Sequence, residues 1–306
     1  MQIEEELAQV PAERETLLTI GVFDGIHLGH CHLLGQLVAN ASAAGLLSGV
    51  ITFNRHPQTV LQPQTTVTSL ITLEERVSLI KSLGVDLVRV LTFTPELAGL
   101  EARQFVLLLM KHLKMRGLVV GPDFALGQKR QGTVASLRRL GQELGFSVDV
   151  VLPISVNGDL VSSTVIRNYV ALGDMKRVQR LLGRPFHLEA EVVAGDERGR
   201  TLGFPTANLD VDQRQALPKD GVYAARVRFN SKVHPAVLNI GLRPTFGGQR
   251  RVVEVHVLDF HGDLYHKRLK VEMVDRLREE LQFTTADELK TQIARDVERT
   301  LALLGS

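Results

Sequence analysis

Two kinds of hydrophobic pattern alternate along the first half of the chain. Stretches with apolar residues at helical spacing, such as Leu73, Val77 and Ile80, separate short runs that are apolar almost throughout. These runs are bounded by glycine or polar residues and cover residues 16–22, 48–53, 85–93, 117–121 and 146–152. Continuous apolar strands that alternate with amphipathic helices predict a doubly wound parallel sheet. Ligands of such sheets bind at the carboxyl ends of the strands, so we expect a site directly after the first run.

The pattern changes at residues 183–185. Residues 162–182 have helical periodicity, and the Gly-Arg-Pro sequence that follows ends it, because proline disfavours helix in the residue before it. The later segments alternate apolar and polar residues between glycine and proline turns, and they cover residues 187–194, 221–229, 234–240, 251–260 and 267–274. That pattern predicts a small antiparallel β-barrel. We therefore expect an N-terminal domain of residues 1–185 and a C-terminal domain of residues 186–306.

The last segment of the chain is helical in pattern again. Thr285, with Glu288 three residues further on, has the spacing of a capping box at a helix start. The apolar residues that follow form one stripe at helical spacing, made of Leu289, Ile293, Val297 and Leu301. We expect this terminal helix to pack on the barrel.

Composition and charge narrow the classes of protein. With 306 residues, of which 44% are hydrophobic, the chain is long enough for two ordinary cores. Its 36 basic and 34 acidic side chains nearly cancel, and only 5% of residues are aromatic, so nothing favours a nucleic-acid or membrane partner. The single cysteine, Cys31, excludes an internal disulfide, and no apolar run approaches the roughly 20 residues that cross a bilayer. The acidic start lacks a signal-peptide pattern, so we expect a cytoplasmic protein, and the oligomeric state stays open.

Two histidines follow the first predicted strand, where a helix is expected to begin. His27 and His30 are three positions apart, so on one helical turn they would share a face, and Gly29 between them lets a backbone or nucleotide approach closely. Free amides at a helix start together with two imidazoles suit the negative charge that develops on a phosphate during its transfer. Two other interpretations stay open: structural histidines, or metal ligands together with Asp24 and His32.

The residues around this pair carry a family resemblance. The HxGH sequence at 27–30 resembles the nucleotidylyltransferases, and the longer match at 21–30, GVFDGIHLGH, resembles their flavin branch, the bacterial bifunctional riboflavin kinases and FMN adenylyltransferases. A second motif of that superfamily, Ser-Ser-Thr-x-x-Arg, stands at 162–167. The resemblance implies an ATP site made of Gly21, Phe23, Asp24, His27, Gly29, His30, Ser162, Ser163, Thr164 and Arg167. Hydroxyls and amides at a helix start, with an arginine one turn in, suit phosphate on physical grounds too.

A loop between these motifs adds a flavin contact. The sequence at 121–127, GPDFALG, resembles the family's flavin- and nucleotide-contacting loop. The resemblance implies that Asp123 and Phe124 bind the flavin in the adenylyltransferase half.

The second half of the chain contains no P-loop, so any use of ATP there needs another phosphate-binding segment. The candidate is the segment at 195–208, where glycines and arginines offer a flexible, basic loop. Thr206 and Asn208 present uncharged oxygens, which suit a Mg²⁺ ion bound mostly by water and nucleotide phosphate. Without further context such a segment is more often only a loop.

The same family resemblance extends over this segment and beyond it. GRTLGFPTANL at 199–209 resembles the flavokinase loop, and the later motifs occur in the family's order, so the resemblance covers nearly the whole chain. It implies Glu254 as the general base for the ribityl 5′-hydroxyl, although an isolated carboxylate there would be read as the solvated face of a strand. It also implies kinase ATP-binding residues Gly195, Gly199, Arg200, Gly203, Thr206 and Asn208, with Thr206 and Asn208 on Mg²⁺, and flavin-binding residues Asn239, Thr245 and Arg276.

Three positions depart from the family pattern, namely Leu28, Arg55 and His266. His266 stands where many members have glycine, which puts the local turn in doubt. The resemblance implies that ATP phosphorylates riboflavin to FMN, and that AMP from a second ATP is then transferred to FMN, giving FAD and pyrophosphate. We therefore expect a Rossmann-like adenylyltransferase followed by a β-barrel flavokinase. An enzyme with only one of these activities and a nucleotide- or RNA-binding protein without activity are the alternatives.

Overall fold

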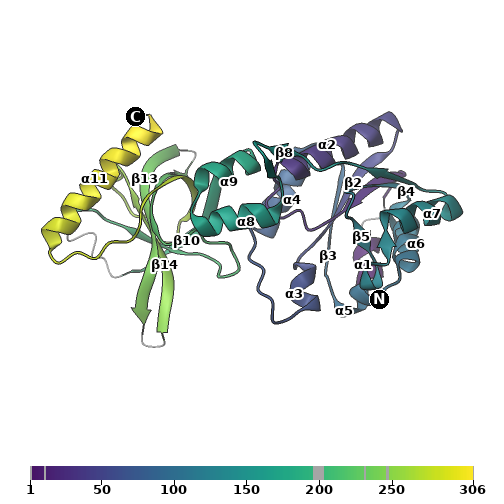
Figure 1. The fold of residues 1–306 in the computed structure, drawn as a ribbon, viewed down its shortest axis with the longest axis horizontal. Coiled ribbons are helices and arrows are strands. Elements are labelled where there is room, and N and C mark those ends of the chain that lie inside the picture. The colour runs from purple at the N-terminus through teal and green to yellow at the C-terminus, as the bar shows by residue number, and fades with distance from the viewer. Residues whose placement is uncertain (1, 10–11, 196–202, 231, 246–247, 306) are drawn as a thin grey trace. The chain divides into compact units, whose positions relative to one another are not determined.

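The computed structural model describes residues 2–9, 12–195, 203–230, 232–245 and 248–305. The chain divides into two compact units, Met1–Ser163 and Thr164–Ser306 (Figure 1). In this division the helices α8 (Ser163–Leu172) and α9 (Met175–Leu182) fall almost entirely with the second unit. The domain boundary expected after residue 185 therefore stays a prediction.

The first unit is built on a five-stranded parallel sheet in the order β3-β2-β1-β4-β7. Its strands are β1 (Thr16–Ile20), β2 (Leu47–Phe53), β3 (Leu87–Leu91), β4 (Met115–Val120) and β7 (Ser147–Val150), with short pairs β5 (Ala125–Leu126) and β6 (Gly132–Thr133), and β8 (Ser155–Val156) and β9 (Asp159–Leu160). Its helices are α1 (Gln2–Ala8), α2 (Leu28–Ala43), α3 (Pro57–Leu61), α4 (Leu73–Ser82), α5 (Pro95–Gly99), α6 (Ala102–Leu113), η1 (Gln128–Arg130) and α7 (Val134–Leu144). The predicted doubly wound parallel sheet is confirmed.

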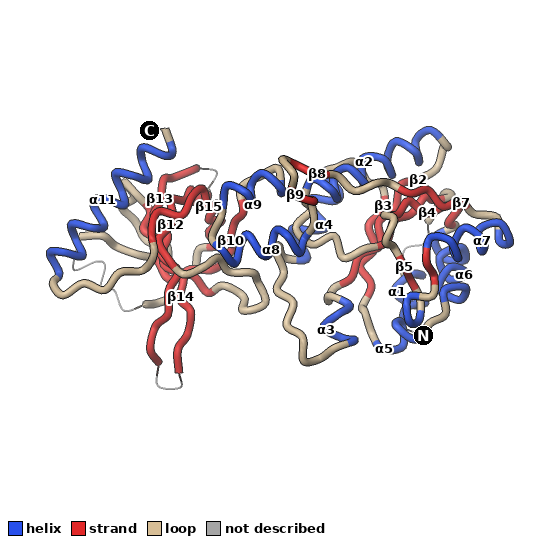
Figure 2. The backbone as a smooth tube through the Cα atoms, viewed as in Figure 1, coloured by secondary structure: helices blue, strands red, loops and turns tan. Residues whose placement is uncertain are grey.

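Strand β1 is buried at every position, which explains why the first run is apolar almost throughout. Leu18 packs into a cluster that includes Leu109 of α6, whereas its neighbour Leu17 packs into a cluster with Leu34 of α2 on the other face. Helices thus cover both faces of the sheet (Figure 2). The chain passes from β1 to β2 and β3 on one side, and returns to β4 and β7 on the other. The carboxyl ends of β1 and β4 therefore form the switch point at which such sheets bind ligands.

The second unit is built on a closed barrel of β-strands (Figure 2). The strand order is β10-β11-β14-β13-β12-β15, and every neighbouring pair is antiparallel. Its strands are β10 (Phe186–Val193), β11 (Ala207–Asp210), β12 (Gly221–Phe229), β13 (Lys232–Thr245), β14 (Gly248–Val257) and β15 (Arg268–Arg278). Fully buried side chains such as Tyr223, Leu238, Val255 and Val271 fill it. The predicted antiparallel barrel is confirmed.

The terminal helix α11 (Ala286–Leu304) packs on the barrel as expected. It begins with the predicted capping box of Thr285 and Glu288, and Val297 and Leu301 pack against buried residues of β12 and β15. On the same helix, the buried carboxylate of Asp296 accepts hydrogen bonds from Arg278 with both oxygens, from Nε to Oδ1 at 3.1 Å and from Nη2 to Oδ2 at 2.8 Å. A bidentate pair of this kind fixes the orientation of the helix on the sheet. Within the described ranges, no helix is both long and apolar enough to cross a membrane.

Candidate active sites

The loop that leaves β1 is held in a strained conformation. Phe23 and Ile26 have left-handed φ angles of 53° and 36°, and Gly25 between them has a φ of 84°. Residues other than glycine adopt left-handed φ angles only at an energetic cost, and residues strained in this way cluster at functional sites. The buried side chains of Phe23 and Ile26 pack into the cluster beneath α2, which keeps the loop in place.

His27 and His30 lie together at the end of this loop, although not as two residues of one helical turn. His27 is the N-cap of α2, and its Nδ1 atom accepts a hydrogen bond of 3.2 Å from the backbone N–H of His30. The two rings stack, with centroids 3.6 Å apart and planes 15° from parallel. Because Nδ1 of His27 is an acceptor here, its Nε2 carries the hydrogen of the neutral ring and can donate to a ligand.

The surroundings of His30 keep its imidazole neutral. Burial lowers the pKa of His30 well below its usual value, and the neighbouring His27 and Arg76 lower that pKa further. The ring meets the edge of Phe23, with centroids 5.1 Å apart. Within the part of the chain that the structure describes, Nδ1 of His30 is buried without a hydrogen-bond partner. This histidine is therefore a polar hydrogen-bonding group at neutral pH and carries no charge.

Asp24 and Gly29 are in contact with other residues of the protein. The buried Asp24 carboxylate accepts the backbone N–H of Leu70 with both oxygens at 3.0 Å, and the Asp24 carbonyl accepts the hydroxyl of Ser163 at 2.9 Å. A Cβ at Gly29 would lie 3.1 Å from Nδ1 of His27 and 3.2 Å from the carbonyl of Val161. The close approach expected at Gly29 is therefore made by protein atoms.

A metal at the histidine pair lacks the necessary ligands. Across the described ranges, no three side chains of histidine, cysteine, aspartate or glutamate are arranged to hold a metal ion. The carboxylate of Asp24 faces the Leu70 amide, and His32 is exposed. The metal interpretation that the sequence left open has no support in this geometry.

The remaining adenylyltransferase candidates are distributed over several elements. Gly21 follows β1 and donates its N–H to the carbonyl of Ile51, at 3.0 Å. Asp123 and Phe124 follow β4, the neighbour of β1, and Asp123 is exposed whereas Phe124 packs on the core. The serine-rich motif lies around the start of α8, where Ser162 and Ser163 end the first unit and Thr164 and Arg167 lie in the second.

A row of polar residues crosses three strands of the barrel. In register, Glu254 on β14 lies directly opposite Asn208 on β11 and directly opposite Asn239 on β13. Residues paired in this way share one face of a sheet, so the three side chains are neighbours. Val253 and Val255, on either side of Glu254, are buried in the barrel. The row therefore lies on the outer face of the barrel wall.

Arg243 is a member of this site that the sequence analysis did not single out. Its guanidinium donates to Oε1 of Glu254 at 2.7 Å, and both side chains are partly buried. Arg243 stands four residues after Asn239 on β13, which places both on the same face of that strand. The even spacing between Asn239 and Arg243 is the sequence feature that could have identified Arg243. The contact holds the Glu254 carboxylate in one orientation.

The glycine-rich segment is described only at its two ends. Gly199 and Arg200 lie outside the described residues, between Gly195 and Gly203. A Cβ at Gly195 would collide with the side-chain amide of Asn208, so the segment passes directly over that amide. Further on, Nδ1 of His256 contacts the carbonyl of Pro205 at 2.7 Å. The segment is thus attached to the barrel next to the polar row.

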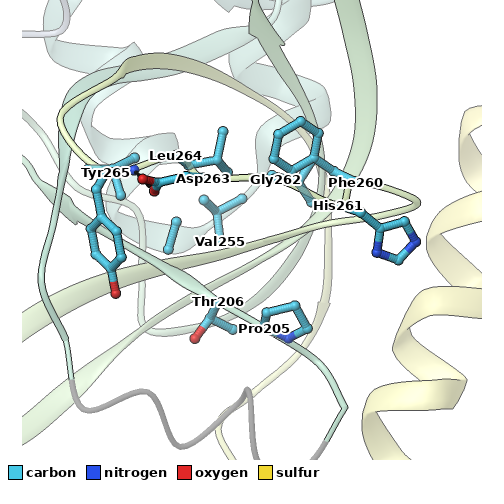
Figure 3. Close-up of a pocket in the computed structure, with 12 residues that line it drawn as sticks. Pro205, Thr206, Val255, Phe260, His261, Gly262, Asp263, Leu264 and Tyr265 are labelled. Carbon is cyan, nitrogen blue, oxygen red and sulfur yellow. Dashed lines mark hydrogen bonds between the residues drawn. The ribbon is translucent and has the colours of Figure 1, made fainter.

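A cavity of about 610 Å³ is lined by Ala207 and Val255, the chain neighbours of Asn208 and Glu254. Pro205 and Thr206 lie across it from residues 260–265, and Val192 and Val255 contribute apolar surface (Figure 3). The ring of Phe260 is held edge-on by Phe229, with centroids 5.1 Å apart. A space of this size, lined by apolar and polar side chains in similar measure, suits a small ligand such as a nucleoside.

The flavin-binding candidates of the kinase do not all lie together. Asn239 belongs to the polar row, and Thr245 pairs with Gly248 at the end of β13, although its side chain is outside what the structure describes. Arg276 lies opposite the inward-facing Tyr223, and its guanidinium donates to the carbonyl of Asp220 at 2.6 Å. Arg276 therefore belongs to the inner face of the barrel wall, whereas the polar row lies on its outer face.

His266 shows what the departure from the family's glycine means. Its φ is 60°, its backbone N–H donates to the carbonyl of Val192 at 3.0 Å, and its exposed ring lies 3.1 Å from Glu191. The turn therefore has the left-handed backbone that glycine adopts without strain, and the exposed contact with Glu191 adds little. The local turn that the departure put in doubt is present.

We expect His266→Gly to increase the free energy of unfolding by roughly 1 kcal/mol, because it removes a left-handed side chain. Urea denaturation followed by circular dichroism measures this change. Lys267→Gly is the matched control, because Lys267 is exposed and has no left-handed φ. That control is expected to lose stability, and a loss of stability in His266→Gly as well would contradict the strain argument.

The two folds and their polar sites define a class of protein: a nucleotidyl transferase of the doubly wound type joined to a small β-barrel kinase. Residues 9–165 match the family model described as FAD synthetase, and residues 182–304 match the one described as riboflavin kinase. The chain is 40% identical to the Escherichia coli K12 protein "Bifunctional riboflavin kinase/FMN adenylyltransferase", over 95% of this chain and 93% of that protein. It is 33% identical to the Bacillus subtilis protein of that name, over 94% and 92%.

Among solved structures, a crystal structure described as a macrolide-efflux protein from Streptococcus pneumoniae is similar, with a TM-score of 0.89 and 31% identity over 96% of each chain. The chain belongs to the family of bifunctional riboflavin kinases and FMN adenylyltransferases. The predicted enzyme class and the two predicted activities are confirmed at the level of this family.

Proposed function

We propose that the chain makes FAD from riboflavin in two ATP-dependent steps, with the kinase step on the barrel and the adenylyl transfer at the end of β1. The observation that carries the kinase assignment is the row of Asn208, Glu254 and Asn239, together with a nucleoside-sized cavity lined by the adjacent residues of the same strands. The observation that carries the adenylyltransferase assignment is the stacked pair of His27 and His30 at the start of α2.

In the kinase step, Glu254 accepts the proton of the riboflavin 5′-hydroxyl as that oxygen attacks the γ-phosphorus of ATP, and ADP leaves. Arg243 orients the Glu254 carboxylate through their 2.7 Å contact. The cavity takes the nucleoside of ATP, and Gly195, Gly199, Arg200 and Gly203 belong to the phosphate-binding segment. Asn239, Thr245 and Arg276 are the proposed flavin contacts.

Mg²⁺ is proposed as the metal of this step. Thr206 lines the cavity and Asn208 lies opposite Glu254, so two uncharged oxygen donors flank the place where the phosphates would lie. Such a donor set fits a hard cation that keeps water and phosphate as its other ligands. When bound, Mg²⁺ would neutralise charge on the phosphates, while Thr206 and Asn208 fix its position.

In the adenylyl step, a phosphate oxygen of FMN attacks the α-phosphorus of ATP and pyrophosphate leaves. His27 and His30 stabilise the developing charge by hydrogen bonds, together with the free amides at the start of α2. Ser162, Ser163, Thr164 and Arg167 are proposed for the pyrophosphate. Because the hydroxyl of Ser163 already donates to the Asp24 carbonyl, its backbone amide is the group that remains for phosphate.

The other candidates of this site fit positions around the nucleotide. Gly21, Phe23, Asp24 and Gly29 shape the loop that receives ATP, and Asp123 with Phe124 is proposed to contact the flavin of FMN. The partners we propose are small molecules, ATP, riboflavin and FMN, with no nucleic acid or membrane. A cytoplasmic location, where ATP is available, is proposed on that basis.

The test is to separate flavins by chromatography after the purified protein is incubated with riboflavin, ATP and MgCl₂. We expect FMN first and FAD later. With excess EDTA we expect a loss of FMN formation of at least tenfold, because phosphoryl transfer then lacks its metal. If folded protein forms no flavin nucleotide in the presence of Mg²⁺, the proposal is wrong.

A further inference from the structure

Arg76 on α4 is a buried cation that the chemistry described above does not use. The residue is only 5% exposed to solvent. Taking a guanidinium out of water costs several kcal/mol unless the protein surrounds it with suitable partners. A charge retained at that cost next to a reaction site is a candidate for a role in the reaction.

The contacts of Arg76 lead to the loop that carries the histidines. Its Nη1 atom donates to the carbonyl of Phe53 at 3.0 Å and lies 3.5 Å from the hydroxyl of Thr52. That hydroxyl donates in turn to the carbonyl of Val22, at 3.0 Å. Arg76 is therefore tied to the carboxyl end of β2 and, through Thr52, to the first residues after β1.

The charge of Arg76 also acts on the site. Together with burial and His27, it lowers the pKa of His30. The other ionisable group of the same loop is Asp24, whose carboxylate is directed to the Leu70 amide. A guanidinium does not lose its proton in the physiological range, so Arg76 contributes a positive charge there that no change of pH removes.

We propose that Arg76 is a positioning residue of the adenylyl-transfer site, which supplies a permanent positive charge near His30 and holds the ends of β1 and β2. The inference rests on the proposed adenylyltransferase site. In this site two kinds of group have different roles. The histidines donate hydrogen bonds as neutral rings, whereas Arg76 and the helix amides supply the positive potential that favours phosphate. Two cationic imidazoles stacked at 3.6 Å would repel each other, so the two histidines cannot both supply positive charge. Arg76 supplies that charge from a separate position.

Two variants separate the charge of Arg76 from its hydrogen bonds. Arg76→Gln removes the charge and keeps a donor, and Arg76→Lys keeps the charge. With FMN and ATP as substrates, we expect Arg76→Gln to lower kcat by about tenfold or more, because a positive charge that acts on the site is lost. Arg76→Lys is expected to stay within about threefold of the wild type. Conversion of riboflavin to FMN by the same samples is expected to be unchanged.

The histidine itself provides a readout that a merely structural role would not move. Titration of the ring signals by NMR, with His30 assigned by comparison with His30→Gln, measures its protonation directly. Removing a neighbouring cation favours the imidazolium, so the pKa of His30 is expected to rise in Arg76→Gln and to keep its wild-type value in Arg76→Lys.

The results distinguish the proposed role of Arg76 from the adenylyltransferase assignment on which it rests. An unchanged His30 titration in Arg76→Gln, or equal activity of Arg76→Gln and the wild type, overturns the proposal. Equal losses in both variants would also overturn it, because the charge would then not matter. A wild type that forms FMN but never FAD, with the expected shift of His30, would instead refute the adenylyltransferase assignment while leaving the electrostatic coupling in place.

Discussion

Replacing Glu254 with glutamine is expected to stop the conversion of riboflavin to FMN while FAD is still formed from added FMN. Glutamine has the shape of glutamate and can still accept a hydrogen bond from Arg243, but it cannot take the proton of the attacking hydroxyl. Loss of a general base costs about 10²- to 10⁴-fold in rate. The measurement is the initial rate of each half-reaction, with the flavins separated by chromatography.

A second barrel carboxylate provides the control for this variant. Glu189 on β10 is paired with Arg268 at 2.8 Å, so it resembles Glu254 in being a strand carboxylate next to an arginine. It lies outside both the polar row and the lining of the cavity. Glu189→Gln is expected to leave both half-reactions unchanged. If Glu254→Gln kept more than about a tenth of the kinase rate, the assignment of the base would fail.

The pattern of apolar residues was sufficient to predict both folds because the relevant physics is local. The first strand is buried throughout because Leu17 and Leu18 point into different cores on the two faces of the sheet. The barrel strands alternate where only one face is buried, as Val253 and Val255 show on either side of Glu254. The period of the pattern thus reports directly on how many faces an element buries.

The row on the barrel could not be predicted in the same way. Asn208, Glu254 and Asn239 are neighbours only because three strands pair in one register, and register depends on contacts between segments far apart in the chain. The pairing of Arg243 with Glu254 depends on that register too. The family resemblance had named Glu254, but the residue that orients it became visible only when the strands were paired.

Arg76 illustrates a different limit. It stands three residues after Leu73 and four before Ile80, so its position is on the apolar face of α4. Its charge nevertheless favoured a solvated side chain, because arginine is rarely buried without suitable partners. Its hydrogen-bond partners Thr52 and Phe53, at the carboxyl end of β2, are supplied by the fold and are not visible in the helix sequence. The burial of Arg76 therefore follows from its place on the apolar face and not from its residue type.

Because His27 is the N-cap of α2, a substitution there can change both the site and the stability of the helix. His27→Ala would remove the imidazole and the cap together, and the loss of a cap costs about 1 kcal/mol of stability. Asparagine is a good N-cap, so His27→Asn keeps the start of α2 and removes only the imidazole. We expect His27→Asn to retain the stability of the wild type, to form FMN from riboflavin at the normal rate, and to form FAD about 10²- to 10³-fold more slowly.

His32→Asn is the matched control for that variant, since His32 lies on the same helix and is exposed. Normal FAD formation by His32→Asn, with FMN accumulating in His27→Asn, would locate the effect in the stacked pair and would also argue against a metal held by His32. Comparing His27→Ala with His27→Asn in thermal unfolding then gives the contribution of the cap by itself. Fast FAD formation by a folded His27→Asn protein would mean that the amides at the start of α2 stabilise the transferring phosphate without that imidazole, and the role proposed for His27 would have to be abandoned.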